Sequence, residues 1–326
     1  MKDQFGRDLT YLRLSVLDRC NLRCLYCMPA HGAGFENWKE LLSYDEIVTL
    51  AVIFAQLGIR KIRLTGGEPL IRKDLEELIS RLREIPEIEE LALSTNGVFL
   101  KGRAQLLKQA GLDRVNISLD TLNPVLFQEI ARMDRLSEVL AGIDDAIRAE
   151  LQPVKLNTVL MKGINDSEIL PLVRFAVERS IDIRFIELMS TNGSVQLDPG
   201  QHFMSTQEAK QQIEEEFNLM PVEAYKSSPA EVFAIAGTGA RVGFISPLSN
   251  FFCARCNRLR IKANGILKTC LHGPEDLNLK ELLHSGLDRE AIKQQIRDVV
   301  YGRPEQHFLN RPEVRHQDFQ MSHVGG

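Results

Sequence analysis

The chain has 326 residues, of which 44% are hydrophobic and 26% charged, so it can bury a sizeable core as one large α/β domain or two ordinary ones. This composition excludes a disordered or fibrous protein. The formal net charge of -4 provides no global field for nucleic acid or an anionic membrane, and the sequence contains no membrane-spanning run or signal peptide. We therefore expect a cytoplasmic protein that binds neither nucleic acid nor membranes.

Short β-branched runs alternate with amphipathic stretches between residues 11 and 189. The pattern predicts strands at 11–16, 61–65, 91–95, 115–119, 154–159 and 183–188, and helices at 44–57, 73–84, 100–110, 136–149 and 166–179. Strand, crossover helix and parallel strand repeated in this way predict a parallel sheet, either doubly wound or curled toward a barrel. In both architectures the functional residues lie at the carboxyl ends of the strands.

Turn-forming residues between 190 and 200 indicate a boundary between a domain at 1–200 and a smaller α+β domain at 201–326. The second region is expected to contain a helix at 206–217, strands at 222–225, 232–235 and 242–245, a hairpin of 258–261 with 266–269, and helices at 277–284 and 288–300. The tail after Tyr301 has no strong period, and we do not expect it to pack like the core.

The six cysteines fall into two groups of three. The first cysteine group is Cys20, Cys24 and Cys27, directly after the first predicted strand, and the second cysteine group is Cys253, Cys256 and Cys270, across the C-terminal hairpin. Three local thiolates without a fourth cysteine can hold three irons of a four-iron cluster and leave one iron open. The alternative is zinc, with His31 or His272 as a fourth ligand. Spacing favours iron and sulfur for the first group and leaves both interpretations open for the second.

With these residues placed, the sequence resembles the radical S-adenosylmethionine enzymes, through the C-x3-C-x2-C spacing of the first cysteine group and through Gly66-Gly67-Glu68-Pro69. It is most similar to the GTP 3',8-cyclase family of molybdenum cofactor biosynthesis, through Cys253-Ala254-Arg255-Cys256-Asn257-Arg258-Leu259-Arg260 and the terminal Gly325-Gly326. The resemblance implies a six-unit open (β/α) barrel followed by a smaller C-terminal α+β domain with an auxiliary cluster. It thereby selects the barrel over the doubly wound sheet.

The same resemblance implies a reaction that converts GTP to 3',8-cyclo-7,8-dihydro-GTP. It implies two [4Fe-4S] clusters and S-adenosylmethionine as cofactors, and a one-electron reductant as a partner. In the family a 5'-deoxyadenosyl radical takes hydrogen from C3' of GTP, and that carbon then attacks C8 of the guanine. Cyclic pyranopterin monophosphate synthase uses the product next. The oligomeric state is left open, with a homodimer as one option.

The resemblance also implies roles for individual residues, at the positions of this sequence that match the family motifs. The residues implied for S-adenosylmethionine are Tyr26, Gly66, Gly67, Glu68 as acceptor for the ammonium group, Ser118 and Met189. Those implied for GTP are Arg13, Arg63, Thr95, Lys155, Arg258 and Arg260, and the catalytic set adds the tail residues Gly325 and Gly326 to Arg258 and Arg260. Five cations from separate segments of a net-acidic chain also favour a triphosphate pocket on charge alone.

Four positions depart from the usual family pattern, namely Leu17, Ser190, Lys262 and Val324. Lys262 would add positive charge near the phosphates if its side chain pointed inward. The nearest rival is another radical S-adenosylmethionine enzyme with an auxiliary cluster, such as a peptide-modifying one. A rival of a different class is a non-catalytic protein with two zinc sites.

Overall fold

The computed structural model describes residues 1–32, 34–189, 197–222, 228–307 and 321–325. Within the first 189 residues it contains β1 (Tyr11–Ser15), β2 (Lys61–Thr65), β3 (Glu90–Thr95), β4 (Arg114–Ser118), β5 (Lys155–Leu160) and β6 (Asp182–Glu187). These six strands pair in sequence order, and every pair is parallel. The ends of all six lie within one residue of the predicted ends, so the predicted alternation is confirmed.

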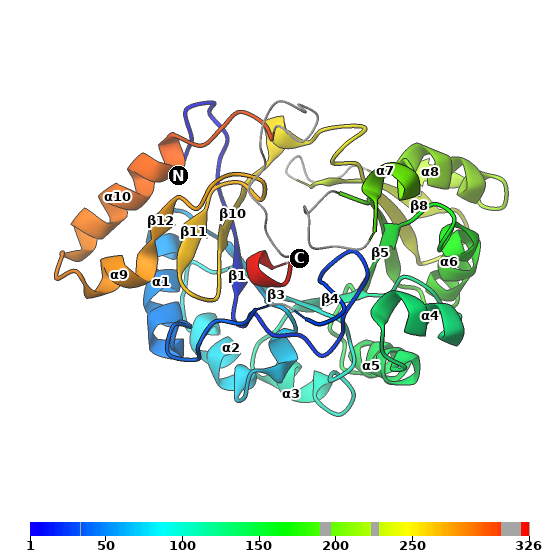
Figure 1. The fold of residues 1–326 in the computed structure, drawn as a ribbon, viewed down its shortest axis with the longest axis horizontal. Coiled ribbons are helices and arrows are strands. Elements are labelled where there is room, and N and C mark those ends of the chain that lie inside the picture. Colours follow the sequence, from blue (N-terminus) through cyan, green and yellow to red (C-terminus); the bar gives the residue numbers. More distant parts are fainter. Residues whose placement is uncertain (33, 190–196, 223–227, 308–320, 326) are drawn as a thin grey trace.

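Helices cover the outer, convex face of the curved sheet (Figure 1), because each parallel pair needs a crossover. They are α1 (Tyr44–Gln56), α2 (Leu75–Arg83), α3 (Ala104–Gln109), α4 (Pro124–Ala131), α5 (Leu136–Arg148) and α6 (Ile169–Glu178), with short 3-10 helices η1 (Pro69–Ile71) and η2 (Asp166–Glu168). The helix α4 was not predicted. It begins after Asn123, whose side chain accepts from the backbone of Val125 and Leu126, with Pro124 at the first helical position.

The C-terminal region extends the same sheet at both edges. It contributes β7 (Leu219–Pro221), β8 (Ala230–Ile235), β9 (Arg241–Ile245), β10 (Arg258–Ile261), β11 (Ile266–Lys268) and β12 (Leu277–Asn278). β9 pairs in parallel with β6, and β10 pairs in parallel with β1, which gives the order β12-β11-β10-β1-β2-β3-β4-β5-β6-β9-β8-β7. The described strands therefore form one open twelve-stranded arc. The division into domains at residue 200 stays a prediction.

The other C-terminal elements are α7 (Pro199–His202), α8 (Thr206–Glu214), η3 (Cys253–Arg255), α9 (Leu279–His284), α10 (Arg289–Tyr301) and α11 (Met321–Val324). The strand predicted at 222–225 lies largely outside the described residues. The predicted helix at 277–284 begins two residues later, because Leu277 and Asn278 form β12 and the Asn278 side chain caps α9.

The prediction that the tail after Tyr301 does not pack like the core is wrong for its described end. α11 lies on the concave side of the sheet, near the centre of the view in Figure 1, and Ser322 and Val324 are each only 2% exposed. The lack of periodicity after Tyr301 therefore does not mean loose packing for the described end of the tail. A four-residue helix is too short to show a period, and its burial depends on the surrounding cavity.

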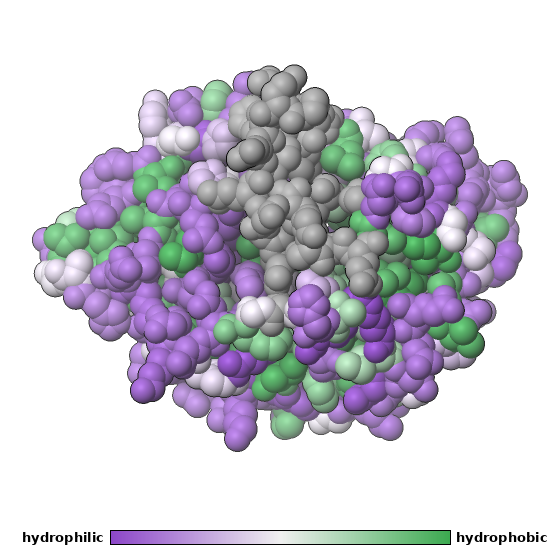
Figure 2. Space-filling view, viewed as in Figure 1, coloured by the Kyte–Doolittle hydropathy of each residue, from purple (hydrophilic) through white to green (hydrophobic). Residues whose placement is uncertain are grey.

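Side chains that alternate along the strands separate an apolar layer from a polar interior. Leu12, Leu14, Ile62 and Leu64 are fully or almost fully buried in the main hydrophobic cluster, whereas the alternate positions of the strands carry charged residues. The described part of the surface in Figure 2 is mostly hydrophilic. Within the described ranges, no helix combines the length and hydropathy that crossing a membrane would require.

Candidate active site

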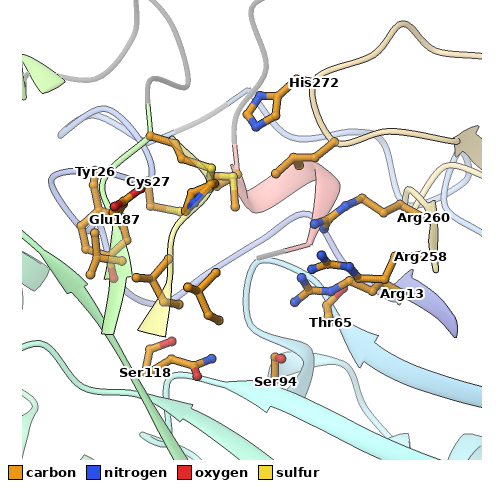
Figure 3. A pocket seen from close by; sticks show the side chains of 18 of the residues that line it. Arg13, Tyr26, Cys27, Thr65, Ser94, Ser118, Glu187, Arg258, Arg260 and His272 are labelled. Carbon is orange, nitrogen blue, oxygen red and sulfur yellow. The ribbon is translucent and has the colours of Figure 1, made fainter. Parts of the chain in front are cut away.

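Both cysteine groups line one cavity of about 320 Å³ at the carboxyl ends of the parallel strands. All six cysteines contribute to its wall, together with polar residues that end β2, β3, β4 and β6, namely Thr65, Ser94, Thr95, Ser118 and Glu187. Figure 3 shows Arg13, Arg258, Arg260 and Thr65 gathered on one side of this space, with Tyr26, Cys27 and Glu187 on the other. The two groups, more than 200 residues apart in the sequence, thus share one chamber.

The first cysteine group lies on a loop that the end of β2 holds closely. The Gly67 N–H donates to the Leu17 carbonyl at 2.7 Å, and the Glu68 N–H donates to the Arg19 carbonyl at 2.7 Å. A Cβ on Gly66 would lie 2.5 Å from the Leu17 carbonyl oxygen, and one on Gly67 would lie 2.2 Å from that of Arg19. Both glycines are therefore required for the approach of the cysteine loop to the strand.

Glu68 joins the ends of β2 and β3. Its carboxylate is fully buried and accepts from the Leu70 N–H at 3.0 Å, the Thr95 hydroxyl at 2.8 Å and the Asn96 N–H at 2.7 Å. Burial raises its pKa to about 7, against these hydrogen bonds. Glu68 is not among the residues that line the cavity, so its contact with a ligand ammonium group stays a prediction.

Burial dominates the chemistry of the first cysteine group. It raises the pKa of Cys20 to about 11 and, together with the charge of Cys20, raises that of Cys27 to about 12; burial and the neighbouring cysteines also raise the pKa of Cys24. The Leu22 N–H donates to the Cys20 sulfur at 3.4 Å, and the Asn96 side-chain amide does so at 3.6 Å. Metal binding must therefore release protons from these thiols, and two N–H donors already face the sulfur of Cys20.

The electrostatic environment of the second cysteine group is different. Burial raises the pKa of Cys256, but the positive charges of Arg258 and Arg303 and the hydrogen bonds that these two residues donate together outweigh it and lower the pKa to about 6. The Arg303 Nη2 donates to the Cys256 sulfur, and its Nη1 donates to the Cys256 carbonyl, both at 3.0 Å. Burial raises the pKa of Cys253 instead. Cys256 is thus prepared as a thiolate, the form that binds metal.

Both groups suit a four-iron cluster. In the described part of the chain, no three His, Cys, Asp or Glu side chains are close enough to hold a single metal ion. A four-iron cluster does not need such convergence, because each cysteine binds a different iron. The three thiols of each group line the cavity and interact with one another, as such a cluster requires.

Three arginines lie side by side across the sheet. Arg260 on β10, Arg13 on β1 and Arg63 on β2 are register neighbours, so their side chains project from the same level of the same face. Arg13 and Arg260 line the cavity, and burial lowers the pKa of Arg13 to about 9 and that of Arg260 to about 10. Arg258 also lines the cavity. Buried guanidinium groups so close together favour an anionic ligand.

Arg63 and Lys155 do not line the cavity. Arg63 donates to the Ser94 hydroxyl at 3.4 Å, and burial lowers its pKa to about 9. Lys155, at the amino end of β5, forms an ion pair of 2.8 Å with Asp182 on β6. Three of the five predicted cations are therefore brought to the cavity wall, whereas direct phosphate contacts for Arg63 and Lys155 stay predictions.

The other predicted S-adenosylmethionine residues lie on the cavity wall. Tyr26, Ser118 and Met189 all line it, as does Thr95 from the GTP set. The Tyr26 hydroxyl donates to Asp120 at 2.8 Å, and burial raises the pKa of Asp120 to about 6. Asp120, two residues after β4 in the chain, was not predicted as a site residue, although its place after a strand was a usable signal.

The described end of the tail borders the same cavity, where Met321 and Ser322 form part of the wall. Gly325 has a φ of +73°, and a Cβ there would lie 2.0 Å from the Thr65 hydroxyl oxygen. Its carbonyl accepts a hydrogen bond from the Arg260 guanidinium. Gly326 lies outside the described residues. The structure thus brings Gly325 and Arg260 together, whereas their catalytic role stays a prediction.

The four departures from the family pattern have separate positions. Leu17 is buried and contributes only its backbone to the glycine contacts, and Val324 is 2% exposed, with its carbonyl accepting from the Arg260 guanidinium at 3.4 Å. Lys262 forms an ion pair with Glu275 and does not line the cavity, so it adds no charge there. Ser190 lies outside the described residues.

Besides Asp120, sequence reasoning missed four charged residues at the wall, namely Arg7, Glu187, Arg303 and Glu305. Glu187 ends β6 and accepts from the backbone N–H groups of Leu248 at 2.9 Å and Ser249 at 3.0 Å, which fixes the loop before the second cysteine group. Its place at a strand end was a signal. Arg303 gave none, because it lies in the segment without a pattern.

Comparisons with known proteins indicate the same family along the whole chain. Residues 14–176 match the Radical SAM superfamily model, and residues 181–309 match the Molybdenum Cofactor Synthesis C model. The GTP 3',8-cyclase of Thermodesulfovibrio yellowstonii is 43% identical and that of Petrotoga mobilis 39% identical, each over 100% of both chains. The GTP 3',8-cyclase of Ectopseudomonas mendocina is 44% identical over 99% of this chain and 98% of its own.

Among solved structures, Streptococcus suis SuiB bound to S-adenosylmethionine is similar with a TM-score of 0.63. The similarity covers 89% of this chain and 68% of SuiB, at 16% sequence identity. At that identity the comparison supports the fold alone, and it agrees with the open barrel.

Proposed function

Because the chain belongs to the GTP 3',8-cyclase family of radical S-adenosylmethionine enzymes, it acts in the first step of molybdenum cofactor biosynthesis, and we propose that the cavity between its two cysteine groups is where GTP is cyclised. One observation carries this proposal: both cysteine groups and three arginines line the same chamber. A radical formed at one end can then reach a nucleotide held at the other without crossing solvent.

The first cysteine group would hold the cluster that binds S-adenosylmethionine. Once the reductant has delivered one electron to that cluster, the S-adenosylmethionine bound there would be cleaved to methionine and a 5'-deoxyadenosyl radical. The chain provides a wall for the methionine portion at Gly66 and Gly67, and Tyr26, Ser118 and Met189 complete that side. The hydrogen bond from Tyr26 to Asp120 fixes the tyrosine ring and orients that wall.

The second cysteine group and the arginines would hold GTP. A triphosphate carries about four negative charges, and bidentate arginines bind phosphate oxygens strongly. Arg13, Arg258 and Arg260 supply those donors at the wall, while buried Arg63 lies next to Arg13 and adds to the positive field. The guanine would then lie toward Cys253, Cys256 and Cys270, which places the ribose between the two halves of the chamber.

The tail completes the enclosure. Of its last described residues, Met321 and Ser322 line the cavity, and the Gly325 carbonyl accepts from Arg260. This arrangement excludes water from the space where a reactive radical would form. It also holds the Arg260 guanidinium in place beside Arg13.

A product assay with two variants tests the proposal. Reduced, reconstituted protein incubated with GTP and S-adenosylmethionine should form 5'-deoxyadenosine and a cyclised GTP derivative. Cys24→Ser should abolish both products, because the first cluster loses a ligand. Cys256→Ser should keep part of the 5'-deoxyadenosine and lose the cyclised nucleotide. Unchanged cyclised product in Cys256→Ser would remove the second cysteine group from the substrate site.

The rivals make different predictions for the metal. Two clusters require about eight irons per chain and a broad absorbance near ~400 nm, whereas two zinc ions are colourless. A peptide-modifying enzyme would leave GTP unchanged.

We further propose that the product passes to cyclic pyranopterin monophosphate synthase and that the protein acts in the cytoplasm, where its six free cysteines stay reduced. A homodimer stays an expectation.

A further inference from the structure

Arg303 occupies a fixed position behind the second cysteine group. It follows α10 by two residues and is 4% exposed. Its N–H donates to the Val300 carbonyl at 3.2 Å, and its own carbonyl accepts from the Gln4 side chain at 3.1 Å. The end of α10 and the N-terminal segment thus hold the Arg303 backbone from two sides, so the position from which its side chain extends is fixed.

The guanidinium of Arg303 binds one cysteine twice. Nη1 donates to the Cys256 carbonyl and Nη2 to the Cys256 sulfur, each at 3.0 Å. Its buried Nε has no hydrogen-bond partner among the described residues, although Arg303 lines the cavity. A buried donor without an acceptor is costly, so this N–H indicates an acceptor that the described residues do not supply.

Such a contact matters because Cys256 is proposed to bind iron. Hydrogen bonds to the sulfurs and nearby charge help to set the reduction potential of an iron–sulfur cluster. Reduction adds one negative charge, which a guanidinium at a ligand sulfur stabilises. The rigid fork of arginine satisfies the carbonyl and the sulfur together, which the point charge of lysine does less well.

We propose that Arg303 is a positioning residue for the second cluster, whose guanidinium fixes Cys256 and raises the reduction potential of that cluster. This inference rests on the proposed role of Cys256 as an iron ligand. It concerns the electronic state of the cluster that faces GTP, and it adds a residue to the site from the last segment of the chain.

Arg7 provides a matched control on the same cysteine group. It is also buried, and it donates to the carbonyls of Cys253 at 3.0 Å and Pro304 at 2.7 Å. Its hydrogen bonds in the described part of the chain all end on oxygen atoms, including those of Asp3 and Glu305. Arg7→Gln therefore loosens the region without removing a donor from a sulfur.

The test compares Arg303→Gln, Arg303→Lys and Arg7→Gln with the unaltered full-length protein after anaerobic reconstitution. Iron per chain is counted first. An EPR-monitored redox titration then follows the second cluster, whose signal is identified as the one that disappears in Cys256→Ser. If Cys256→Ser keeps all iron and both signals, the ligand assignment is wrong, which is a failure of the proposed function and not of the Arg303 contact alone.

At the midpoint potential of the unaltered second cluster, Arg303→Gln should lower the ratio of reduced to oxidised cluster about tenfold, which is ~59 mV for one electron. Arg303→Lys should lower it less, since the charge remains, and Arg7→Gln should also lower it less, because it removes a nearby charge but no donor to a sulfur. A fully loaded Arg303→Gln that titrates like the unaltered protein would overturn the inference. So would an equal shift in Arg7→Gln. If Arg303→Gln does not load iron, an unchanged ratio in Arg303→Lys is the overturning result.

Discussion

At the scale of single residues, the cavity depends on side chains that bind backbone carbonyls. Arg260 donates to the Gly325 carbonyl, and Arg303 donates to that of Cys256. A carbonyl has a fixed place in the chain, so each guanidinium is oriented before any ligand arrives. Preorganised donors are what a charged substrate needs, because they require little rearrangement on binding.

Gly325→Ala should reduce cyclised product at least tenfold, an effect of about 1.4 kcal/mol. The added Cβ would lie 2.0 Å from the Thr65 hydroxyl oxygen, and φ is +73°, so the tail must move and Arg260 loses its acceptor. Initial rates of product formation measure the effect.

Gly302→Ala is the control for Gly325→Ala. Gly302 has a φ of -71°, and its nearest neighbour to an added Cβ is a carbonyl oxygen at 3.6 Å, so alanine fits there. We expect this variant to keep most of its rate. Full activity in Gly325→Ala would show that the described position of the tail is not needed for the reaction.

At the scale of elements, carboxylates at strand ends connect neighbouring parts of the cavity wall. Glu68 links the ends of β2 and β3, and Glu187 links the end of β6 to the loop at Leu248 and Ser249. Each is at most 1% exposed. The loops that carry the cysteines are thus held to the sheet by buried carboxyl groups as well as by packing.

Glu68 makes stability depend on pH. Burial raises its folded pKa to about 7, above the ordinary value of 4.5, so the folded state binds its proton more tightly than the unfolded state does. Its contribution is greatest below pH 4.5 and is lost as the pH rises through about 7, with a full effect of about 3 kcal/mol.

Urea unfolding of the full chain between pH 5 and 8 measures this effect. Glu68→Gln removes the titration, so its free energy of unfolding should decline less steeply with rising pH than that of the unaltered protein. Asp120, whose pKa burial raises to about 6, acts in the same direction and remains in the variant. Parallel curves for the two proteins would contradict the account of Glu68.

Local sequence predicted the elements of the barrel well. The six strands and the cysteine loop after β1 follow from alternation and from Cys20-x3-Cys24, which act over short distances. The pair Gly66-Gly67 was expected to form a ligand wall, and the structure adds that it also admits the cysteine loop. α4 was missed although Asn123-Pro124 is a helix-start signal, because its eight residues give a weak period.

At the scale of the whole molecule, pairing across long sequence separations forms the cavity. β10 pairs with β1 and β9 with β6, so the C-terminal region closes on both edges of the six-stranded core. This brings the second cysteine group to the same cavity as the first. No local pattern specifies these partners, and the same limitation applies to the pairing of Lys155 with Asp182 and to the place of Arg303.

The charge distribution follows from the same pairing. The molecule is acidic overall, yet Arg260, Arg13 and Arg63 become neighbours only when β10, β1 and β2 lie together. The convergence of such cations could be predicted from the sequence, since binding a triphosphate requires several positive charges at one place. It could not choose which of them would reach the cavity wall.

The central claim is that a radical formed at the first cysteine group acts on GTP inside the same chamber. The direct measurement uses GTP carrying deuterium at C3', with the reduced, reconstituted protein and S-adenosylmethionine, and determines the mass of the 5'-deoxyadenosine by mass spectrometry. We predict that one deuterium appears in the 5'-deoxyadenosine and that the cyclised nucleotide has lost it. Unlabelled 5'-deoxyadenosine beside a nucleotide that keeps its deuterium would contradict the shared chamber.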